Sequence, residues 1–482
     1  MMQTAFDLIV IGSGPAGRRA AIQAAKLDKK VLVVEKSHRV GGVSVHTGTI
    51  PSKTLRETVL NLSGWRERGF YGRTYKVKSD ITAEDLRHRL SKTLDHEVDV
   101  LEHQFTRNNV TLVNGHARFL SRQEIEVTMT DGRVRQFSFE RALVSVGTKP
   151  YRPDYIPFDG ETVLDSDEIL NVTSLPRSLT VIGAGVIGIE YATIFSALDI
   201  SVTVVEPRSS ILSFIDDELI AEFTYELRDR GIKLLLGCKA QDVNNSGEAC
   251  IVDLSDSRKV KSEMVLYAAG RLGASSDIGL DAIGLSADSR GRITVDPVSF
   301  ETEVPNIYAA GDIIGFPSLA STSMSQGRIA VCHAFDVPNP AKPEHFPYGI
   351  YAVPEISTVG LSERELKEQG IPYECGIARF RETSRGHIMG LQRGMLKMLF
   401  HIETRKLLGV HIVGEGATEL IHIGQAVLVL GGELSYFIDN VFNYPTLAEA
   451  YKIAALDAWN RLSLHAFESE EEAEANLAVV NG

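Results

Sequence analysis

The chain has 482 residues, with 50 Lys and Arg against 63 Asp and Glu and a formal net charge of −13. This length predicts about three domains. Apolar residues make up 44% of the chain, as in globular proteins, which argues against a disordered or fibrous chain. The acidic balance argues against nucleic acid and anionic membrane as partners.

Other classes of protein are disfavoured by what the sequence lacks. Its four cysteines are too few for the disulfide framework of a small secreted protein. No CxxC, HExxH or carboxylate-rich calcium loop occurs, so we expect no metal site. We also expect no signal peptide and no membrane span, since no apolar stretch reaches about 18 residues. These features together predict a soluble cytoplasmic protein.

Strand and helix alternate at the start of the chain. Residues 6–12 form a short apolar run, residues 15–27 have apolar side chains at helical spacing, and residues 29–36 form a second apolar run. The same order returns in the middle of the chain, with strand, helix and strand predicted at residues 179–185, 186–198 and 200–207. The sequence therefore predicts a βαβ unit that is used twice.

The rest of the chain predicts further elements and two proline-rich boundaries. Residues 81–108 have the pattern of one long amphipathic helix, and short strands are predicted after it at residues 110–120, 124–129, 134–139 and 141–147. Proline-rich segments at residues 150–161 and 337–349 predict domain boundaries. An α+β domain is predicted beyond them, with strands at 349–360, 395–401 and 407–414 and helices at 417–430 and 447–462. The last residues, 466–482, are predicted to be a solvated acidic tail.

Each βαβ unit contains three glycines between its first strand and its helix. They are Gly12, Gly14 and Gly17 in the first unit and Gly183, Gly185 and Gly188 in the second. The first glycine permits a tight turn, the second lets the backbone approach a pyrophosphate, and the third lets helix and strand pack closely. The N-terminus of the helix then offers free N–H groups to the phosphates.

An acidic residue follows each glycine motif at the same distance. Glu35 and Glu206 each lie 18 residues after the third glycine, at the end of the next predicted strand. This repeated register predicts two dinucleotide sites, most simply one for a tightly held flavin and one for an exchangeable nicotinamide. Asp312, after a short strand ending in Gly-Asp, suits a ribityl hydroxyl of FAD. The first site is therefore predicted to hold FAD and the second NAD or NADP.

Residues 5–463 resemble the pyridine nucleotide-disulfide oxidoreductase family, which includes dihydrolipoamide dehydrogenase and glutathione reductase. The resemblance rests on both glycine motifs and on the segments 41–53, 143–150, 265–273, 308–315, 353–363 and 443–450. It implies an α/β fold of two Rossmann-like dinucleotide-binding domains and a C-terminal α+β dimerisation domain. The implied domains are an FAD domain (1–152 and 279–346), an NAD(P) domain (153–278) and an interface domain (347–465). A homodimer or larger homo-oligomer is implied as well.

The chain departs from the disulfide reductases of this family at their thiol chemistry. Those enzymes carry two cysteines as CxxxxC where this chain has Ser44 and Thr49. A hydroxyl cannot form a disulfide and is not ionised at neutral pH. The reductases also have a histidine, held by a glutamate five residues later, where this chain has Tyr444 and Glu449. Disulfide reductase activity is therefore excluded.

The resemblance also implies roles for individual residues. Lys53 and Glu190 would lie beside flavin N5, where they would bias its reduction. A helix beginning near Leu319 and Ala320 would point its N-terminus at the flavin C2=O and N1 edge. Further cofactor contacts are implied at Lys36, Gly41, Gly42, Ser44, Lys53, Ala117, Gly147 and Gly270.

Tyr444 would reach the active site of a partner subunit. The roles of Val186 and Arg208, near the second dinucleotide site, stay open. Val186 is small enough to leave the flavin face open, but plain helix packing explains it equally well. Glu206 suits the 2′-hydroxyl of NAD and would repel the 2′-phosphate of NADP, whereas Arg208 could pair with that phosphate or be an ordinary loop arginine.

Within the family, residues 45–53, 419–426 and 442–451 are most similar to the soluble pyridine nucleotide transhydrogenases. This similarity implies reversible hydride exchange between NADPH and NAD through bound FAD, with no dithiol step. Two alternatives stay open: an NAD(P)H dehydrogenase that passes electrons to a quinone or other small acceptor, and a flavin-binding sensor with little turnover.

Overall fold

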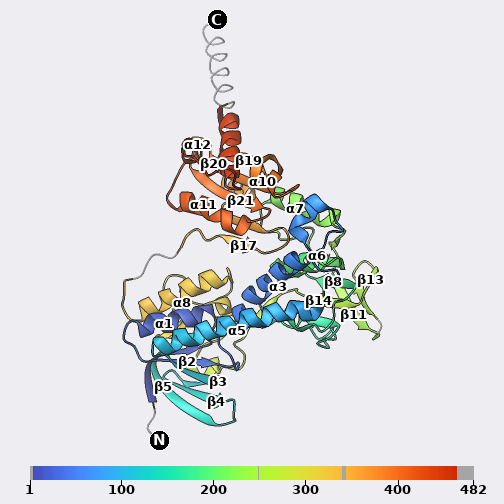
Figure 1. The fold of residues 1–482 in the computed structure, drawn as a ribbon. Helices are drawn as coiled ribbons and strands as arrows, with labels where there is room; N and C mark the ends of the chain where they lie inside the picture. The colour runs from blue at the N-terminus through green and yellow to red at the C-terminus, as the bar shows by residue number, and fades with distance from the viewer. Residues whose placement is uncertain (1–3, 248, 339–342, 464–482) are drawn as a thin grey trace. The chain divides into compact units, whose positions relative to one another are not determined.

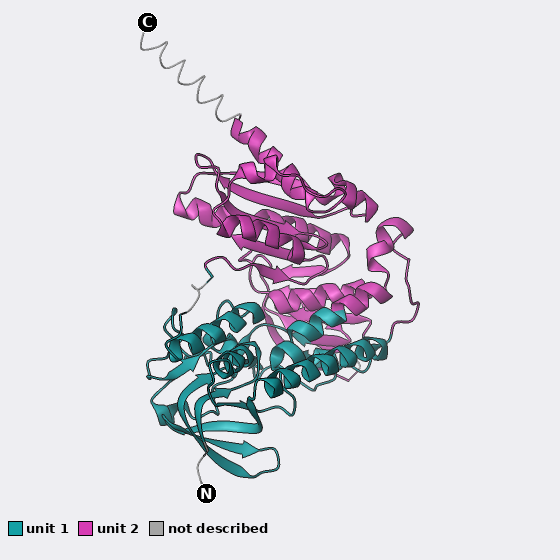
Figure 2. Cartoon of the chain, turned by 60° about the vertical axis from the view of Figure 1, so that its left-hand side comes forward, with its two compact units in different colours: residues 1–55, 82–175, 266–343 teal, residues 56–81, 176–265, 344–482 magenta. Residues whose placement is uncertain are grey.

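The computed structural model describes residues 4–247, 249–338 and 343–463, so the predicted acidic tail lies outside the described residues. The chain divides into two compact units (Figure 2). Unit 1 contains residues 1–55, 82–175 and 266–343, and unit 2 contains residues 56–81, 176–265 and 344–482. No helix in the described ranges is both long and apolar enough to cross a bilayer.

Unit 1 is built on a six-stranded sheet (Figure 1). Its strands are β1 (Thr4–Ile11), β2 (Val31–Glu35), β3 (Thr111–Ser121), β4 (Glu124–Met129), β5 (Val134–Val144) and β16 (Ile307–Ala309). The order is β1-β2-β3-β4-β5-β16, and β1 also pairs with β5. β1 therefore lies between β2 and β5, parallel to both, whereas β4 runs antiparallel to β3 and β5.

The two faces of this sheet are covered differently. Leu8 and Val10 of β1 pack on one face with apolar residues of α1 (Pro15–Ala25), α5 (Ala83–Arg107) and α8 (Ala320–Ala334). Ile9 and Ile11 point to the other face, where they join a second core with residues of β2, β3, β4, β5 and the segment 278–313. This alternation explains why β1 is apolar throughout, since a central parallel strand is buried on both faces.

Unit 1 also contains several short elements. They are α2 (Val43–His46), the start of α3 (Thr49–Leu62), β6 (Thr148–Pro150), β7 (Val163–Asp165), η2 (Ile169–Asn171), β15 (Arg271–Gly273), η3 (Leu280–Ile283) and η4 (Asp312–Ile314). The long helix α5 begins with a reciprocal capping box, in which the side chains of Thr82 and Asp85 each accept a backbone N–H of the other residue.

Unit 2 contains three parallel strands that pair in the order β10-β9-β8, and β14 begins at its boundary. Its elements are β8 (Ser178–Ile182), α6 (Val186–Ala197), β9 (Ser201–Glu206), α7 (Asp217–Asp229), β10 (Lys233–Leu236) and β14 (Met264–Tyr267). A small antiparallel sheet follows β10, formed by β11 (Ala240–Asn245), β12 (Cys250–Leu254) and β13 (Lys259–Ser262). Helix α6 is buried from Gly188 to Ala197, as its apolar sequence predicts.

The C-terminal part of unit 2 is an antiparallel sheet in the order β17-β18-β21-β20-β19, with α11 packed against β18 and β21. Its elements are β17 (Tyr348–Ile350), β18 (Ile356–Gly360), α9 (Glu363–Gln369), β19 (Tyr373–Arg379), η5 (Phe380–Glu382), α10 (Ser384–Ile388), β20 (Met395–His401), β21 (Leu407–Val413), α11 (Ala417–Val429), α12 (Leu434–Asp439) and a helix that begins at residue 449 and continues to the last described residue, 463. Unit 2 also includes η1 (Trp65–Glu67) and α4 (Arg68–Tyr71).

Two predictions about strands were wrong. The strand expected at residues 349–360 is broken into β17 and β18, because the N–H groups of Tyr351 and Val353 bond to side chains of α6 and Pro354 has no N–H to offer. The two strands expected at 134–139 and 141–147 are one continuous strand, β5, in which the exposed Glu140 points outward.

Candidate functional site: two matching turns and the residues around them

The turn that joins β1 to α1 has the geometry of a phosphate-binding loop. Gly12 has φ +100°, and a Cβ there would lie 2.4 Å from the Ser145 carbonyl oxygen. A Cβ at Gly17 would lie 2.0 Å from the Gly12 carbonyl oxygen. A Cβ at Gly14, in contrast, would meet nothing within 4 Å. The protein itself requires glycine at the first and third positions, and it leaves open space at the second.

The turn that joins β8 to α6 repeats this geometry. Gly183 has φ +106°, and a Cβ at Gly188 would lie 1.9 Å from its carbonyl oxygen. A Cβ at Gly185 would meet nothing within 4 Å. In the part of the chain that the structure describes, Gly14 and Gly185 are the only glycines that combine an ordinary φ with open space. Their open space fits the close approach of a ligand such as a pyrophosphate.

The two helices that follow these turns begin in the same way. Gly14 and Gly185 are the N-caps of α1 and α6, with φ/ψ of −62°/−176° and −75°/−176°. No side chain among the described residues caps either helix at this position. The first N–H groups of α1 and α6 therefore remain free to bind an anion.

The acidic residue at the end of the second strand of each unit bonds to its own turn. Glu35 Oε2 accepts the backbone N–H of Ser13 at 3.0 Å, and Glu35 Oε1 accepts that of Ser37 at 2.8 Å. The same two bonds occur in the second unit: Glu206 Oε2 accepts the N–H of Ala184 at 2.7 Å, and Glu206 Oε1 accepts that of Arg208 at 3.1 Å. The repeat found in the sequence is thus a repeat of hydrogen bonds as well.

The side chains around the two acids distinguish the two sites. Ser13 Oγ donates to Glu35 Oε2 at 2.5 Å and accepts the N–H of Gly41 at 2.9 Å. Glu206 is bound by a guanidinium instead, with Arg208 Nε 2.7 Å from Oε1 and Nη2 3.1 Å from Oε2. Burial alone would raise the pKa of Glu206, but the hydrogen bonds from Arg208 and Ala184 lower it below its usual value. Glu206 is therefore ionised and paired at neutral pH.

Other predicted contact residues in unit 1 have varied surroundings. Lys36 forms an exposed ion pair with Asp277 at 2.8 Å. Ala117, on β3, is buried in the second core of unit 1, so only its backbone could contact a ligand. The predicted glycines have positive φ values: Gly41 (+118°), Gly42 (+60°), Gly147 (+65°) and Gly270 (+126°).

Asp312 is the first residue of η4 and follows β16 closely. Burial raises the pKa of its carboxyl, although Arg271 and a hydrogen bond with Ser323 act in the opposite direction. A buried carboxyl of this kind needs further polar partners, and ligand hydroxyls would supply them. Helix α8 begins at Ala320 with Leu319 as its N-cap, at the position that the sequence predicts, and Leu319 makes no side-chain cap.

The two positions that carry the dithiol in the reductases have hydroxyl side chains here. Ser44, in α2, donates its Oγ hydrogen to the carbonyl oxygen of Gly41 at 3.1 Å, and Thr49 is the first residue of α3. The four cysteines of the chain lie outside this segment, at positions 238, 250, 332 and 375. The segment therefore has no thiol to take up electrons.

Lys53 and Glu190 belong to different units. Lys53 Nζ donates to Ser52 Oγ at 3.3 Å. Glu190 is 4% exposed, and its Oε1 accepts the N–H of Tyr351 at 2.9 Å. Thr193, one turn later in α6, accepts the N–H of Val353 at 3.0 Å. Sequence reasoning missed these two backbone donors, because a backbone N–H has no signature in the side-chain sequence.

The three remaining predicted residues lie at the start of α6 and near the C-terminus. Val186 is the first residue of α6 and is half-buried. Tyr444 is 71% exposed, and its hydroxyl lies 2.5 Å from Ser384 Oγ. Glu449 has one buried oxygen, Oε2, with no hydrogen-bond partner among the described residues.

Comparison with known proteins places both parts of the chain in one family. Residues 6–327 match the family model described as pyridine nucleotide-disulphide oxidoreductase, and residues 346–455 match the dimerisation domain of the same description. A protein of Mycobacterium bovis named soluble pyridine nucleotide transhydrogenase is 48% identical over 458 residues, which cover 95% of this chain and 98% of that protein. A protein of the same name from Colwellia psychrerythraea is 42% identical over 461 residues, with the same coverage of both chains.

A solved structure also matches nearly the whole fold. The crystal structure of LpdA from Mycobacterium tuberculosis superposes with a TM-score of 0.86 at 25% identity. The superposition covers 94% of this chain and 99% of that one. The predicted α/β fold with dinucleotide-binding domains is thereby confirmed.

Proposed function

Because this chain belongs to the pyridine nucleotide-disulphide oxidoreductase family, we propose that it is a transhydrogenase that exchanges hydride reversibly between NADPH and NAD through FAD, without a dithiol step. The observation that carries this proposal is a combination: both dinucleotide turns are intact, while Ser44 and Thr49 replace the dithiol. Without thiols, electrons taken from one nicotinamide must leave to a molecule that enters from outside, and a second nicotinamide is the simplest one.

The first turn and its surroundings suit FAD, and the second turn suits NAD and NADP. FAD, when bound, supplies a carrier that accepts a hydride and then releases it. In unit 1 the free N–H groups of α1 would bind its pyrophosphate, Glu35 would bind its ribose, and Asp312 would bind its ribityl chain. In unit 2, α6 would bind the pyrophosphate of the nicotinamide substrate, and Glu206 with Arg208 would meet its adenosine ribose.

The roles that the resemblance implies for other residues belong to the same proposal. Lys53 and Glu190 would each bias hydride transfer at flavin N5, and the N-terminus of α8 would favour negative charge at the N1 and C2=O edge of the ring. Tyr444 and Glu449 act across the interface of a homodimer. The chain functions in the cytoplasm, with an FAD domain at 1–152 and 279–346, an NAD(P) domain at 153–278 and an interface domain at 347–465.

A steady-state assay tests this function. Purified holoenzyme is mixed with NADPH and a thio-analogue of NAD, and the reduced thio-analogue is followed by its own absorbance. Rapid formation of that product is expected. A dehydrogenase that uses a quinone would instead oxidise NADPH only when a quinone is added, and a flavin-binding sensor would turn over neither acceptor. Either of these results would reject the transhydrogenase.

A further inference from the structure

The loop between β9 and α7, residues 207–216, contains the arginine that meets the predicted 2′ position. Ile211, Leu212 and Ile215 are buried, and the N–H of Leu212 donates to the carbonyl oxygen of Ala184 at 3.4 Å. The side chain of Arg208 is 51% exposed. Its bonds to Glu206 use Nε and Nη2, and its Nη1 donates to Ser213 Oγ at 3.4 Å. These bonds use three of the five N–H donors of the guanidinium and leave two for a ligand.

Two residues of the C-terminal part of unit 2 also contact this loop, Arg364 of α9 and Tyr348 of β17. Arg364 Nη1 donates to the carbonyl oxygen of Ser213 at 2.9 Å, and Nη2 of the same side chain pairs with Asp217 at the start of α7. The ring of Phe214 packs edge-on against the ring of Tyr348, with their centroids 5.0 Å apart. All of these residues belong to unit 2.

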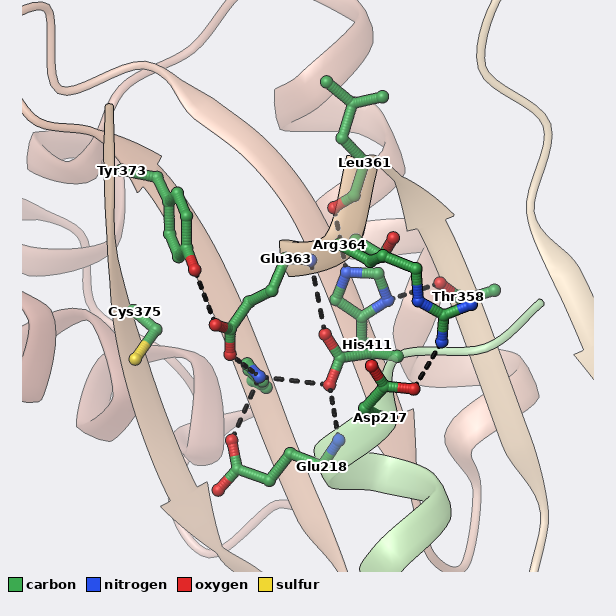
Figure 3. A network of polar contacts seen from close by, with 12 residues as sticks. Asp217, Glu218, Thr358, Leu361, Glu363, Arg364, Tyr373, Cys375 and His411 are labelled. Atoms are coloured by element: carbon green, nitrogen blue, oxygen red, sulfur yellow. Dashed lines mark hydrogen bonds and ion pairs between the residues drawn. The ribbon is translucent and has the colours of Figure 1, made fainter. Parts of the chain in front are cut away.

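A second group of ion pairs holds the last residue of the loop, Asp216 (Figure 3). Lys397, with a fully buried side chain, places its Nζ 3.0 Å from Asp216 Oδ1 and 3.0 Å from Glu218 Oε2, and it also pairs with Glu363. Asp216 is the N-cap of α7 and accepts the N–H of Glu218. The end of the loop is therefore held by Lys397, whereas Arg364 bonds to Ser213, the residue whose hydroxyl accepts from Arg208.

We propose that Arg364 is a positioning residue for the 2′-phosphate of NADP(H), because it fixes Ser213, which in turn holds the guanidinium of Arg208. This inference rests on the proposed function, since it takes NADP(H) to bind at the second dinucleotide turn. A long arginine side chain that is already ordered loses less conformational entropy when it binds a phosphate. Arg364 therefore favours NADP(H) binding, although no contact between it and the ligand is required.

The test measures binding of two adenosine fragments to the holoenzyme by calorimetry. The fragment 2′,5′-ADP contains the 2′-phosphate, and 5′-AMP lacks it. We expect Arg364→Ala to weaken 2′,5′-ADP binding about three- to tenfold and to leave 5′-AMP binding unchanged. In steady state, the KM for NADPH should rise by a similar factor, while kcat and the KM for NADH stay the same.

Two further variants control for a general structural effect. Arg379, the last residue of β19, lies 3.7 Å from Glu222 on α7, outside the loop, so Arg379→Ala should leave both fragments unaffected. Combined with Arg208→Ala, Arg364→Ala should weaken 2′,5′-ADP binding no further, because the residue that it positions is gone.

The possible results distinguish a failure of the role proposed for Arg364 from a failure of the proposed transhydrogenase function. If the wild-type enzyme binds 2′,5′-ADP no better than 5′-AMP, the use of NADPH at this turn is wrong, and the inference falls with it. If the wild type does discriminate and Arg364→Ala discriminates equally well, the inference alone is overturned. Equal weakening of both fragments also overturns it, because Arg364 would then support the whole loop and not the 2′ position.

Discussion

Arg208 lies across the carboxylate of Glu206, with its Nε 2.7 Å from one oxygen and its Nη2 3.1 Å from the other. The same carboxylate also accepts two backbone N–H groups, those of Ala184 and Arg208. An acid in this position would repel a 2′-phosphate, but here its charge is compensated by an arginine that keeps two donors free. The pair would thus let one site accept both NAD(H) and NADP(H), as the proposed function requires.

Substitution of either partner should therefore change cofactor preference in opposite directions. We expect Arg208→Ala to raise the KM for NADPH about tenfold or more and to change that for NADH little, since a charge-assisted bond contributes about 1.5–3 kcal/mol. Glu206→Asn should raise the KM for NADH and lower that for NADPH. Steady-state kinetics with both cofactors checks this.

The exposed ion pair of Arg133 with Asp131, which has the same spacing on the hairpin between β4 and β5, offers a matched control. Arg133→Ala should leave both Michaelis constants as they are. If the Arg208 and Glu206 variants treat the two cofactors alike, neither residue recognises the 2′ position.

The absence of thiols at positions 44 and 49 limits how many electrons the protein can take up. Anaerobic titration with NADPH should bleach the flavin after two electrons per FAD, with no long-wavelength band from a thiolate beside the flavin. Absorbance spectra check this. Alkylation of the cysteines should not change the end point, because none lies in the replaced segment. Uptake of four electrons would contradict the proposed chemistry.

The open space at Gly14 and Gly185 allows the two dinucleotide sites to be tested separately. Alanine fits the protein at both positions, since a Cβ would meet nothing and φ is ordinary. We expect Gly14→Ala to lower FAD occupancy and Gly185→Ala to raise the Kd for NADH while FAD stays bound. Flavin absorbance after gel filtration and a binding titration measure the two effects. Each variant is the control for the other, and a reversed result would exchange the two assignments.

Asp312 offers a second test of the FAD site. Asp312→Ala would leave a ribityl hydroxyl without its partner, at a cost of about 1–3 kcal/mol. FAD should be lost on gel filtration, and the thermal midpoint should fall because bound ligand stabilises the fold. Asp281→Ala, at an exposed position of the same unit, should change neither quantity. An Asp312→Ala enzyme with full FAD content and an unchanged midpoint would show that the residue does not hold the cofactor.

The buried Lys397 makes the stability of the protein depend on pH in a predictable direction. Burial alone would raise the pKa of Glu363, but hydrogen bonds from Lys397 and Tyr373 lower it to about 2. Its stabilising contribution is therefore complete above the unfolded pKa of about 4.3 and is lost as the pH falls toward 2. Lys397→Met removes the cation and leaves the buried carboxylate of Asp216 without it, which should cost about 3–5 kcal/mol at pH 7.

The loss of unfolding free energy caused by Lys397→Met should shrink as the pH falls, because the Asp216 carboxylate, left without its cation, then becomes protonated. Denaturation at pH 7 and at pH 5 measures the difference. Lys367, an exposed lysine 3.2 Å from the same Glu363, is the control: Lys367→Met should cost little at either pH. An equal loss for Lys397→Met at both values would mean that lost packing, not charge, destabilises the variant.

The repeated elements were predictable from sequence because a few local rules determine them. Glycine spacing located both turns, and apolar runs located β1, β2, β8 and β9 to within about three residues. The partners of those elements were not predictable. That Arg208 binds Glu206 depends on the rotamers of both side chains, and that Lys397 meets Asp216 depends on how distant segments pack. The break between β17 and β18 could not be foreseen either, since it follows from acceptors on α6, far away in the sequence.

The bond between the N–H of Tyr351 and the carboxylate of Glu190 is made by the main chain of one residue and the side chain of the other. Mutation at position 351 therefore cannot delete the donor unless it introduces proline, and the same holds for Val353 and its bond to Thr193. Evolution can vary both side chains without losing the attachment of α6, whereas positions 190 and 193 lack that freedom. Mutational scanning should accordingly show that positions 351 and 353 tolerate substitution and that positions 190 and 193 do not.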